Sequence, residues 1–341
     1  MSTNESISQA SIKNENTRAI FREIASSEGI SRAEISARTH LSLMTVGKVA
    51  DMLIKEGIVT QAKPSTGGAG RRAGMLTVSE KHFILTIDLL DTRFRASILN
   101  LRLESIDSII YPYNDSLFPE DNLIIFFRET STLLLKHLMD KKNIGTGICI
   151  PGDYDEKSDT IVGNTYKHLS GLKIAETMKR SIGFAPSKII SGMTAATSSE
   201  LSELPTEKKG CIISLILDGG ISGCISFNGK VLPRPSDFGS LICENGKRLE
   251  RNLAERSNIF DEEDFCRQLG SALRPIVSVL CPDTIFLSAN EQNFTDWFPE
   301  LLKNEFSRFA SPPDIFFETG KKIRSNMGVA MLIRDEMIRS L

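Results

Sequence analysis

The stretch SRAEISARTHLSLMTVGKVADMLIKEGIV, from Ser31 to Val59, constrains the fold of this chain more than any other. Ser31 begins a short helix with a capping box, because its hydroxyl can accept from the Glu34 amide while the Glu34 carboxylate reaches back. After a tight break, Ser42 caps a second helix. The apolar residues of that helix recur at spacings of three and four, which marks one buried face, and Gly57 ends it. They are Val46, Val49, Ala50, Leu53 and Ile54.

Two short helices joined by such a turn form a helix-turn-helix, whose second helix lies in the major groove of DNA. An amphipathic helix around 19–25 covers the pair, and strands at 58–60 and 75–78, joined by the polar loop PSTGGAGRRAG, form a wing. An ordinary helical hairpin is the alternative, but it requires the capping, the turn and the wing to coincide by accident. We therefore predict a winged helix-turn-helix domain at residues 1–78, with 1–15 as a frayed tail.

The residues of the second helix that face away from its buried side form the candidate reading surface. Lys48 is expected on a phosphate or a guanine, and Leu43 and Met44 on thymine methyl groups. Glycine weakens a helix by ~1 kcal/mol relative to alanine, so Gly47 suggests a close approach of the backbone to DNA. The predicted DNA-binding residues of the two helices are Arg32, Ser42, Leu43, Met44, Thr45, Gly47 and Lys48.

Two further cations, Arg71 and Arg72, lie between glycines in the wing loop. A flexible basic loop can enter a narrow A·T-rich minor groove, whose negative potential attracts arginine. The same loop can instead touch only phosphates as a solvated wing tip. Both interpretations make Arg71 and Arg72 DNA-binding residues, and the sequence does not decide between them.

Composition limits the class of protein. The 341 residues suffice for two or three domains, and no run approaches the ~18 apolar residues of a membrane helix. Residues 1–14 are polar and lack the apolar core of a signal peptide, so we expect a cytoplasmic protein. Residues 1–78 carry 10 lysines and arginines against 7 acidic residues, whereas the remainder carries 31 against 36. This contrast suits a DNA reader joined to a body that does not bind DNA.

Other reactive side chains receive structural interpretations. The six cysteines are scattered without a CxxC pair, which favours buried free thiols over disulfides or a zinc ribbon. The four histidines lie in unrelated segments and are expected in structural or surface roles. Asp153 and Asp155 fall in PGDYDEKSD, where we expect a polar turn between strands rather than a catalytic or metal-binding pair.

Beyond the wing, a pattern of strands followed by helices occurs twice. The predicted strands are 83–89, 94–100, 105–110, 147–152, 188–192, 210–217 and 223–227, and the predicted helices are 120–141, 174–181 and 195–201. The last two strands form a hairpin around Asp218. This repetition predicts two α/β lobes with a ligand cleft between them.

The order of these motifs resembles that of the ROK family, named for repressors, open reading frames and sugar kinases. The resemblance rests on the winged helix, the GRR loop, a strand ending in Asp88, GTGICIPG, ISGMTAATSSE and LDGGISGCISFNGK, and it covers about residues 16–337. Members with a winged helix are transcriptional regulators of the xylose-repressor kind, and members without it are sugar kinases. The resemblance implies an α/β protein with an N-terminal winged helix-turn-helix and a two-lobed, actin-like, sugar-kinase-like body. Lobe one would span 79–190 with a C-terminal helix at 322–341, and lobe two, implied to dimerise, would span 191–321.

The positions that carry kinase chemistry in the family are altered here. Family kinases have a phosphate turn Asp-x-Gly-Gly-Thr, whose glycines admit the phosphates, whereas Asp88 is followed by LLDT. Their general base is the Asp of a Glu-Asn-Asp-Ala-Asn motif. The matching residues here are 190–194, and Gly192 stands in place of the base. The resemblance therefore implies a body without phosphoryl transfer.

The family's second phosphate loop and its zinc-binding segments are altered as well. The matching loop starts with Asp218, and Cys243 alone remains of four Cys and His zinc ligands. We expect neither a metal nor a cofactor. The candidate ligand cleft carried over from the family comprises Asp88, Gly152, Asn164, Ser191, Gly192, Gly219, Gly220 and Ser240.

The sequence thus predicts a DNA-binding transcriptional regulator, and more specifically a repressor, whose partner is double-stranded operator DNA. Its non-catalytic body is expected to form a homodimer or a higher oligomer and to sense a sugar or related small molecule of carbohydrate metabolism. One alternative is a sugar kinase with a fused DNA-binding domain, against which the missing base argues. A second alternative is a dimeric scaffold that binds no ligand, and the sequence does not separate this scaffold from a sensor.

Overall fold

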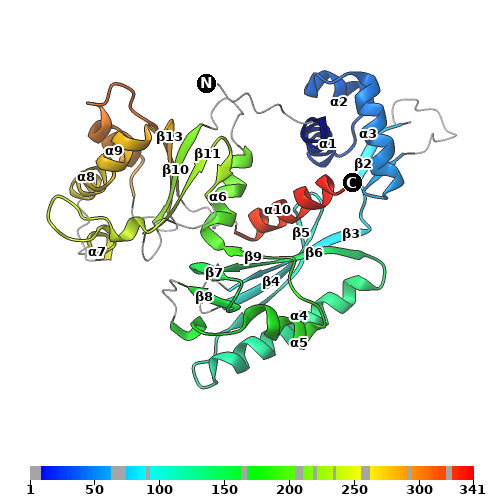
Figure 1. The fold of residues 1–341 in the computed structure, drawn as a ribbon, viewed down its shortest axis with the longest axis horizontal. Helices are drawn as coiled ribbons and strands as arrows, with labels where there is room; N and C mark the ends of the chain where they lie inside the picture. The colour runs from blue at the N-terminus through cyan, green and yellow to red at the C-terminus, as the bar shows by residue number, and fades with distance from the viewer. Residues whose placement is uncertain are drawn as a thin grey trace.

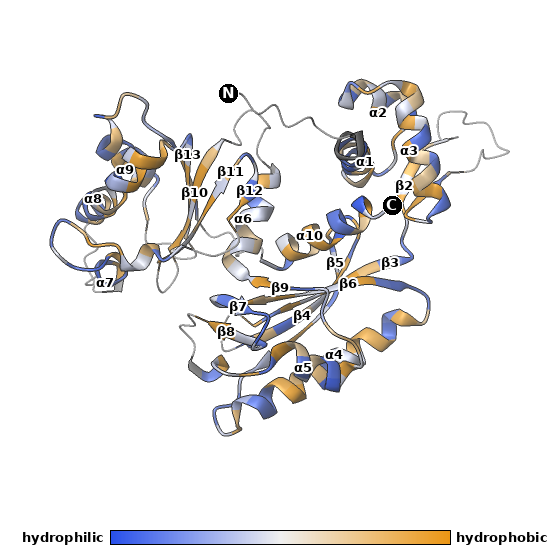
Figure 2. Ribbon diagram, in the orientation of Figure 1, coloured by the Kyte–Doolittle hydropathy of each residue, from blue (hydrophilic) through white to orange (hydrophobic). Residues whose placement is uncertain are grey.

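The structure, a computed structural model, describes residues 9–62, 74–89, 93–162, 167–203, 210–217, 221–232, 236–254, 262–289, 294–319 and 325–341. Figure 1 shows a small N-terminal unit above one lobe, with a second lobe beside them. Apolar residues follow the central strands and the inner faces of the helices (Figure 2). Within the described ranges, no helix is long and apolar enough to cross a membrane.

The N-terminal unit, here called the winged unit, consists of three helices and a two-stranded sheet. α1 (Gln9–Ala25), α2 (Arg32–Thr39) and α3 (Leu43–Lys55) precede β1 (Val59–Gln61) and β2 (Leu76–Val78), which pair antiparallel. The apolar residues of α3 form one buried face, as their spacing predicted, and they pack in one core with residues of the other elements. This core includes Ile20, Ile24, Ile35, Val46, Ala50, Leu53 and Leu76, each fully buried.

Lobe one is built on a five-stranded sheet in the order β5-β4-β3-β6-β9. Its strands are β3 (His82–Asp88), β4 (Arg93–Asn100), β5 (Ser105–Pro112), β6 (Lys142–Ile150) and β9 (Lys188–Ser191). β4 is antiparallel to both neighbours, whereas β3, β6 and β9 run parallel. Parallel strands are covered on both faces. Alternate residues of β3 pack with α4 (Pro119–Leu138) and α5 (Ile174–Ile182) on one face, and with α10 (Ser325–Arg339) on the other.

Lobe two repeats this plan with the strand order β12-β11-β10-β13-β14. Its strands are β10 (Cys211–Leu217), β11 (Ile221–Phe227), β12 (Lys230–Val231), β13 (Thr284–Ala289) and β14 (Asp314–Thr319). One face packs with α7 (Leu249–Ala254), α8 (Glu262–Leu280) and α9 (Phe298–Phe306). Residues of α6 (Gly192–Glu203) pack with Ile216 on the other face, as alternation along β10 requires.

α6 and α10 cross between the two lobes (Figure 1). The crossing is very close at Gly328, because a Cβ atom there would lie 1.7 Å from the carbonyl oxygen of Ala195. Gly145 and Gly147 of β6 similarly allow α10 to lie on the sheet, against Ile333 and Val329. Glycine at these positions therefore fixes how closely α10 approaches both the sheet and α6.

Several boundaries differ from the sequence-based expectations. α1 begins at Gln9, so the N-terminal residues from Gln9 to Glu15 are helical rather than frayed, since polar residues continue a helix whose apolar stripe starts later. PGDYDEKSD is more than a turn, because β7 (Asp153–Asp155) pairs with β8 (Thr160–Val162) and only the residues between them turn. The cysteines are free and five are buried, but Cys281 is exposed, contrary to the prediction.

Candidate DNA-binding surface and ligand cleft

The helix-turn-helix is fixed by short polar bonds at each helix start. The Ser31 amide donates to Glu34 Oε2 at 2.9 Å, and the Glu34 amide donates to Ser31 Oγ at 3.2 Å, which completes the capping box. The Ser31 hydroxyl donates to Glu34 Oε2 at 2.7 Å, and this bond, together with that from the Ser31 amide, holds the pKa of Glu34 below its usual value. His40 adopts a left-handed conformation with φ of 56° and makes the turn, after which Ser42 Oγ accepts from the Thr45 amide at 3.1 Å. Local sequence therefore sets the angle between α2 and α3.

The outer face of α3 presents apolar and basic side chains to solvent. Leu43 is 58% exposed, Met44 is 70% exposed, and Lys48 is exposed as well. The Thr45 hydroxyl lies 2.9 Å from the Ser42 hydroxyl, so these two predicted residues are held together at the helix start. A Cβ atom at Gly47 would meet nothing within 4 Å. The structure thus brings the predicted residues of α3 onto one accessible surface.

Arg32 has a different environment from the other predicted DNA-binding residues. Its guanidinium lies 2.7 Å from Asp51 Oδ1 on α3 and 3.4 Å from Gln61 Oε1 on β1. These contacts connect α2, α3 and the wing strand. In this structure the partners of Arg32 are therefore protein groups on α3 and β1.

The wing is anchored by its strands. Thr60 of β1 and Thr77 of β2 place their hydroxyls 2.9 Å apart, and the Ile30 amide donates to the Leu76 carbonyl at 3.1 Å. The loop that joins the strands, with Arg71 and Arg72, lies outside the described residues. The choice between groove insertion and phosphate contact for these arginines stays a prediction.

The candidate cleft residues of lobe one gather at the carboxyl ends of parallel strands. Asp88 ends β3, Gly152 follows β6 with φ of 93°, and Ser191 ends β9, while the register pairs Asp88 with Cys149 and Ile150 with Ser191. Asn164, Gly219 and Gly220 fall outside the described ranges. Ligands bind at this edge of open α/β sheets. Ser240 lies in lobe two, in the short 3₁₀ helix Phe238–Ser240, where its hydroxyl donates to Asp237 at 2.6 Å.

The side chains at this edge differ from those that phosphoryl transfer requires. Ser325 Oγ, at the start of α10, donates to Asp88 Oδ1 at 2.8 Å, and the Cys149 thiol donates to the Ser325 carbonyl at 3.4 Å. Burial raises the pKa of Asp88, although Ser325 and Arg95 oppose the shift. Gly192 opens α6 and offers no side chain that could accept a proton. Asp88 is thus hydrogen-bonded to the start of α10, and Gly192 offers no base at the position that matches the family's general base.

A metal centre is not visible in the described part of the chain. No group of three or more His, Cys, Asp or Glu side chains there has the spacing to hold a metal ion. Cys243 is buried, and burial raises the pKa of its thiol, which disfavours the thiolate that zinc requires. The structure therefore gives Cys243 a place in the lobe-two core.

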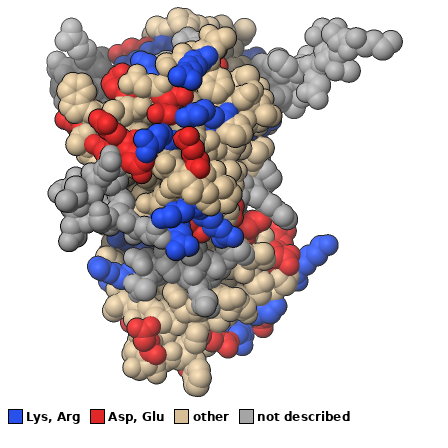
Figure 3. Space-filling model, turned by 90° about the vertical axis from the view of Figure 1, so that its left-hand side faces the viewer, with Lys and Arg blue, Asp and Glu red and all other residues tan. Residues whose placement is uncertain are grey.

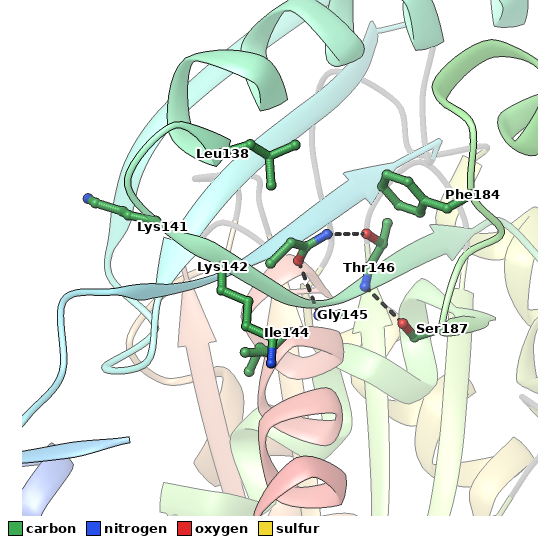
Figure 4. A pocket seen from close by; sticks show the side chains of 9 residues that line it. Leu138, Lys141, Lys142, Ile144, Gly145, Thr146, Phe184 and Ser187 are labelled. Carbon is green, nitrogen blue, oxygen red and sulfur yellow. Dashed lines mark hydrogen bonds between the residues drawn. The ribbon is translucent and has the colours of Figure 1, made fainter. Parts of the chain in front are cut away.

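A groove on lobe one lies away from the predicted cleft. It is lined by the end of α4, the start of β6 and the segment before β9, including Leu138, Ile144 and Phe184 (Figure 4). Asn143 Nδ2 donates to Thr146 Oγ1 at 3.1 Å, and the Thr146 amide donates to Ser187 Oγ at 3.1 Å. The groove thus occupies the amino end of β6, opposite the edge where Asp88 and Ser191 lie.

The face of lobe two that Figure 3 shows carries charges of both signs. Figure 3 shows acidic and basic side chains interspersed on the side of the molecule that lobe two occupies in Figure 1. DNA-binding surfaces instead cluster lysine and arginine. This distribution matches the acidic excess of the body and directs attention to the winged unit as the DNA reader.

The sequence did not single out the residues that join the winged unit to lobe one. Arg18 and Arg22 of α1 both contact Asp335 of α10, and Arg102 contacts the end of α1. The signal available in the sequence was the spacing of Arg18 and Arg22, four residues apart on one helix face. Their shared partner lies at the far end of the chain, so sequence spacing could not identify it.

Comparisons with known proteins agree with this geometry. Residues 13–60 match a family described as winged helix-turn-helix DNA-binding. The chain is also similar to the xylose repressor of Bacillus subtilis (strain 168), with 30% identity over 159 residues. That alignment covers 44% of this chain and 40% of the repressor, so it spans less than half of that relative.

The fold is similar to those of solved ROK proteins. A crystal structure of a ROK family transcriptional regulator, described as a homologue of the E. coli MLC protein, matches with a TM-score of 0.68 and 14% identity, covering 97% of this chain and 98% of that one. The ROK hexokinase of Thermus thermophilus matches with a TM-score of 0.58 and 16% identity, covering 76% of this chain and 100% of its own. These findings confirm the resemblance and the fold class predicted from the sequence. The chain joins a winged helix-turn-helix DNA-binding domain to a sugar-kinase-like body, and so has the architecture of the ROK-family transcriptional regulators.

Proposed function

We propose that this protein is a DNA-binding transcriptional repressor whose kinase-like body is not an enzyme. The exposed first two turns of α3, with Leu43, Met44 and Lys48 accessible on a capped helix, carry the proposal. The similarity to the xylose repressor and to the ROK transcriptional regulator supports it. Operator DNA is the partner, and such a protein acts in the cytoplasm.

We divide the chain into the winged unit at 1–78, lobe one at 79–190 with the C-terminal segment 322–341, and lobe two at 191–321. The separate sheets of the two lobes and the packing of α10 on β3 and β6 support this division. Two-fold DNA reading requires a two-fold protein, so we place the dimer contact in lobe two, away from the winged unit. Sedimentation at micromolar concentration tests the dimer, and a monomer would overturn this part alone.

The DNA-reading surface is tested by comparing two lysines of the same helix. Lys48 lies near the start of α3 and Lys55 at its end, and neither has an ion pair within the described residues. Duplexes selected from random sequence by the wild-type protein serve as probes in fluorescence anisotropy. We expect Lys48→Ala to weaken binding and to reduce the salt slope by about 1, as loss of one phosphate contact does, or to relax one base preference. Lys55→Ala should bind like the wild type.

Thr45→Ala extends the test to the helix start, where Thr45 bonds the Ser42 hydroxyl. Unchanged binding by both Thr45→Ala and Lys48→Ala would exclude α3 as the reader. Failure of the wild-type protein to select any DNA sequence would overturn the proposed function itself.

The sugar kinase with a fused reader is the second candidate, favoured by the similarity of the body to solved sugar kinases. Two observations argue against a kinase. Gly192 occupies the position of the general base, and Ser325 of α10 hydrogen-bonds to Asp88. A coupled assay of ATP consumption with a panel of hexoses decides the question. We expect no sugar-dependent turnover, and measurable turnover would overturn the non-enzymatic assignment.

We further propose that the cleft between the lobes senses a sugar or a related molecule. α10 begins at Ser325, which hydrogen-bonds to Asp88 at the predicted cleft, and its other end contacts the winged unit. A ligand that moves α10 could therefore change the position of the winged unit. Thermal-shift screening against sugars, sugar phosphates and nucleotides tests this, because a ligand at 100 times its Kd adds ~2.7 kcal/mol to stability. A screen without a shift would favour the ligand-independent scaffold.

A further inference from the structure

We propose that Asp335 is a positioning residue for DNA reading: its carboxylate holds α1 of the winged unit on α10 and thereby fixes the direction in which α3 faces DNA. This inference rests on the proposed function, since it concerns how a DNA reader is oriented. It assigns no DNA contact to Asp335 itself.

The first observation is an ion-pair cluster between the winged unit and the C-terminal helix. Arg18 and Arg22 lie one turn apart on α1 and share one acceptor, Asp335 Oδ2. Arg18 Nη2 donates a hydrogen bond to this oxygen, and Arg22 Nη2 lies 3.4 Å from it. The Asp335 side chain is only 9% exposed. A carboxylate shielded in this way interacts more strongly with its partners than a surface pair does.

The second observation is the charge balance around this carboxylate. Arg334, beside Asp335, is 7% exposed, donates from Nη1 to the Leu101 carbonyl at 2.9 Å and lies over the Phe21 ring at 5.6 Å. Burial lowers the pKa of Arg334, and Asp335 opposes that shift. Among the described residues, these three arginines share Asp335 as their carboxylate partner. Removing its charge would leave the buried Arg334 guanidinium without a carboxylate and close to two other cations, which is strongly unfavourable.

The third observation is a second set of contacts, at the carboxyl end of α1. Arg102, in the turn between β4 and β5, donates from Nη1 to the carbonyls of Ala25 and Ser27 at 3.0 and 2.6 Å. A cation at these carbonyls also complements the helix dipole. Phe21 and Ile24 of α1 share a continuous apolar core with Leu101 and Ile333 of lobe one. The winged unit is therefore docked on the body along its first helix.

Docking of α1 determines where α3 points. α1 packs on both α2 and α3, so the reading helix moves with α1 as one unit. β2 ends at Val78 and β3 begins at His82, so the direct covalent connection to lobe one is short. Without the Asp335 contact, this connection still tethers the winged unit but no longer sets its angle. In a dimer, a fixed angle favours one spacing of the two half-sites.

The test compares Asp335→Asn with Glu336→Gln, the adjacent carboxylate, which is 53% exposed and pairs with Lys188 of the body at 2.7 Å. The probes are a duplex selected by the wild-type protein, its isolated half-site, and versions with about 5 base pairs, half a turn, inserted between half-sites. We expect Asp335→Asn to lose about tenfold or more in affinity for the selected duplex. It should lose the spacing preference yet bind the isolated half-site normally. Glu336→Gln should behave like the wild type, and Asp335→Glu should restore part of the preference.

Hydrogen exchange gives a readout that does not depend on DNA. Asp335→Asn should speed amide exchange in α1 and leave β3 and β6 protected, because the reader undocks while the sheet stays intact. Should this variant not fold, Arg22→Gln removes one arm of the same cluster from a side chain that is 42% exposed. Wild-type exchange in α1, or equal losses on the half-site and the full duplex, would overturn the inference. A wild-type protein that selects no DNA would instead refute the proposed function, whatever α1 does.

Discussion

Gly328→Ala probes the crossing of α10 and α6 with a single methyl group. An ideal Cβ there would lie 1.7 Å from the Ala195 carbonyl oxygen and 2.4 Å from its carbonyl carbon. To reach the 3.4 Å of an ordinary contact, the two helices must separate by about 1.7 Å at this point. The opposing atoms belong to the α6 backbone and cannot rotate away, so the clash has to move a helix.

The expected cost follows from two opposing effects. Overpacking a well-packed interior destabilises a protein by about 1–3 kcal/mol, and a backbone clash belongs at the upper end of that range. The higher helix propensity of alanine relative to glycine offsets about 1 kcal/mol of this cost. We therefore expect the free energy of unfolding to fall by about 2 kcal/mol. In a domain of 150–250 residues, Tm shifts by about 2–4 °C per kcal/mol, so Tm should fall by roughly 4–8 °C.

Gly47→Ala provides the matched control, since Gly47 is also a helical glycine but has open space where the new methyl group would lie. It should gain up to about 1 kcal/mol in stability. Circular dichroism melts of both variants and the wild type give the comparison. If Gly328→Ala melts at or above the wild-type Tm, the close crossing does not exist in solution and the reasoning fails. DNA affinity of Gly47→Ala also bears on the predicted backbone approach, because a methyl group at that surface should weaken binding.

Two further predictions concern a partly buried acid and an exposed thiol. Asp88→Asn should keep the bond from Ser325 but remove a carboxyl whose pKa burial raises above its ordinary 3.8. Because native Asp88 holds its proton at pH values where the unfolded chain has released it, wild-type stability should fall as pH rises through that window. Urea unfolding should therefore show the stability of Asp88→Asn rising relative to that of the wild type as pH increases above the ordinary pKa of 3.8. A constant or falling difference would contradict the raised pKa of Asp88. Native protein should react with one equivalent of a thiol reagent, at Cys281, and unfolded protein with six, since the other five cysteines are buried. Rapid reaction of two or more thiols in the native state would show that a buried cysteine is accessible.

The sequence by itself determined the features that depend on neighbours along the chain. The capping box at Ser31 and Glu34, the cap at Ser42 and the spacing of Val46, Ala50 and Leu53 each act within one or two helical turns, so the winged unit could be predicted. Most strands of lobe one and the β10–β11 pair followed from their apolar runs for the same reason. Between residue 230 and the C-terminal helix that the resemblance implied at 322–341, no elements were predicted, and the structure adds α7, α8, α9, β13 and β14 there.

Tertiary structure alone decided the contacts between distant segments. The sequence analysis placed Arg32 among the DNA-binding residues, but only the fold showed its guanidinium on Asp51. Ser325 reaches Asp88, and Asp335 reaches Arg18, from opposite ends of the chain. No periodicity links such residues, because periodicity reports which face of an element is buried and not which partner covers it. The direction in which the reading helix points is therefore a property of the assembled fold, fixed where α10 meets α1.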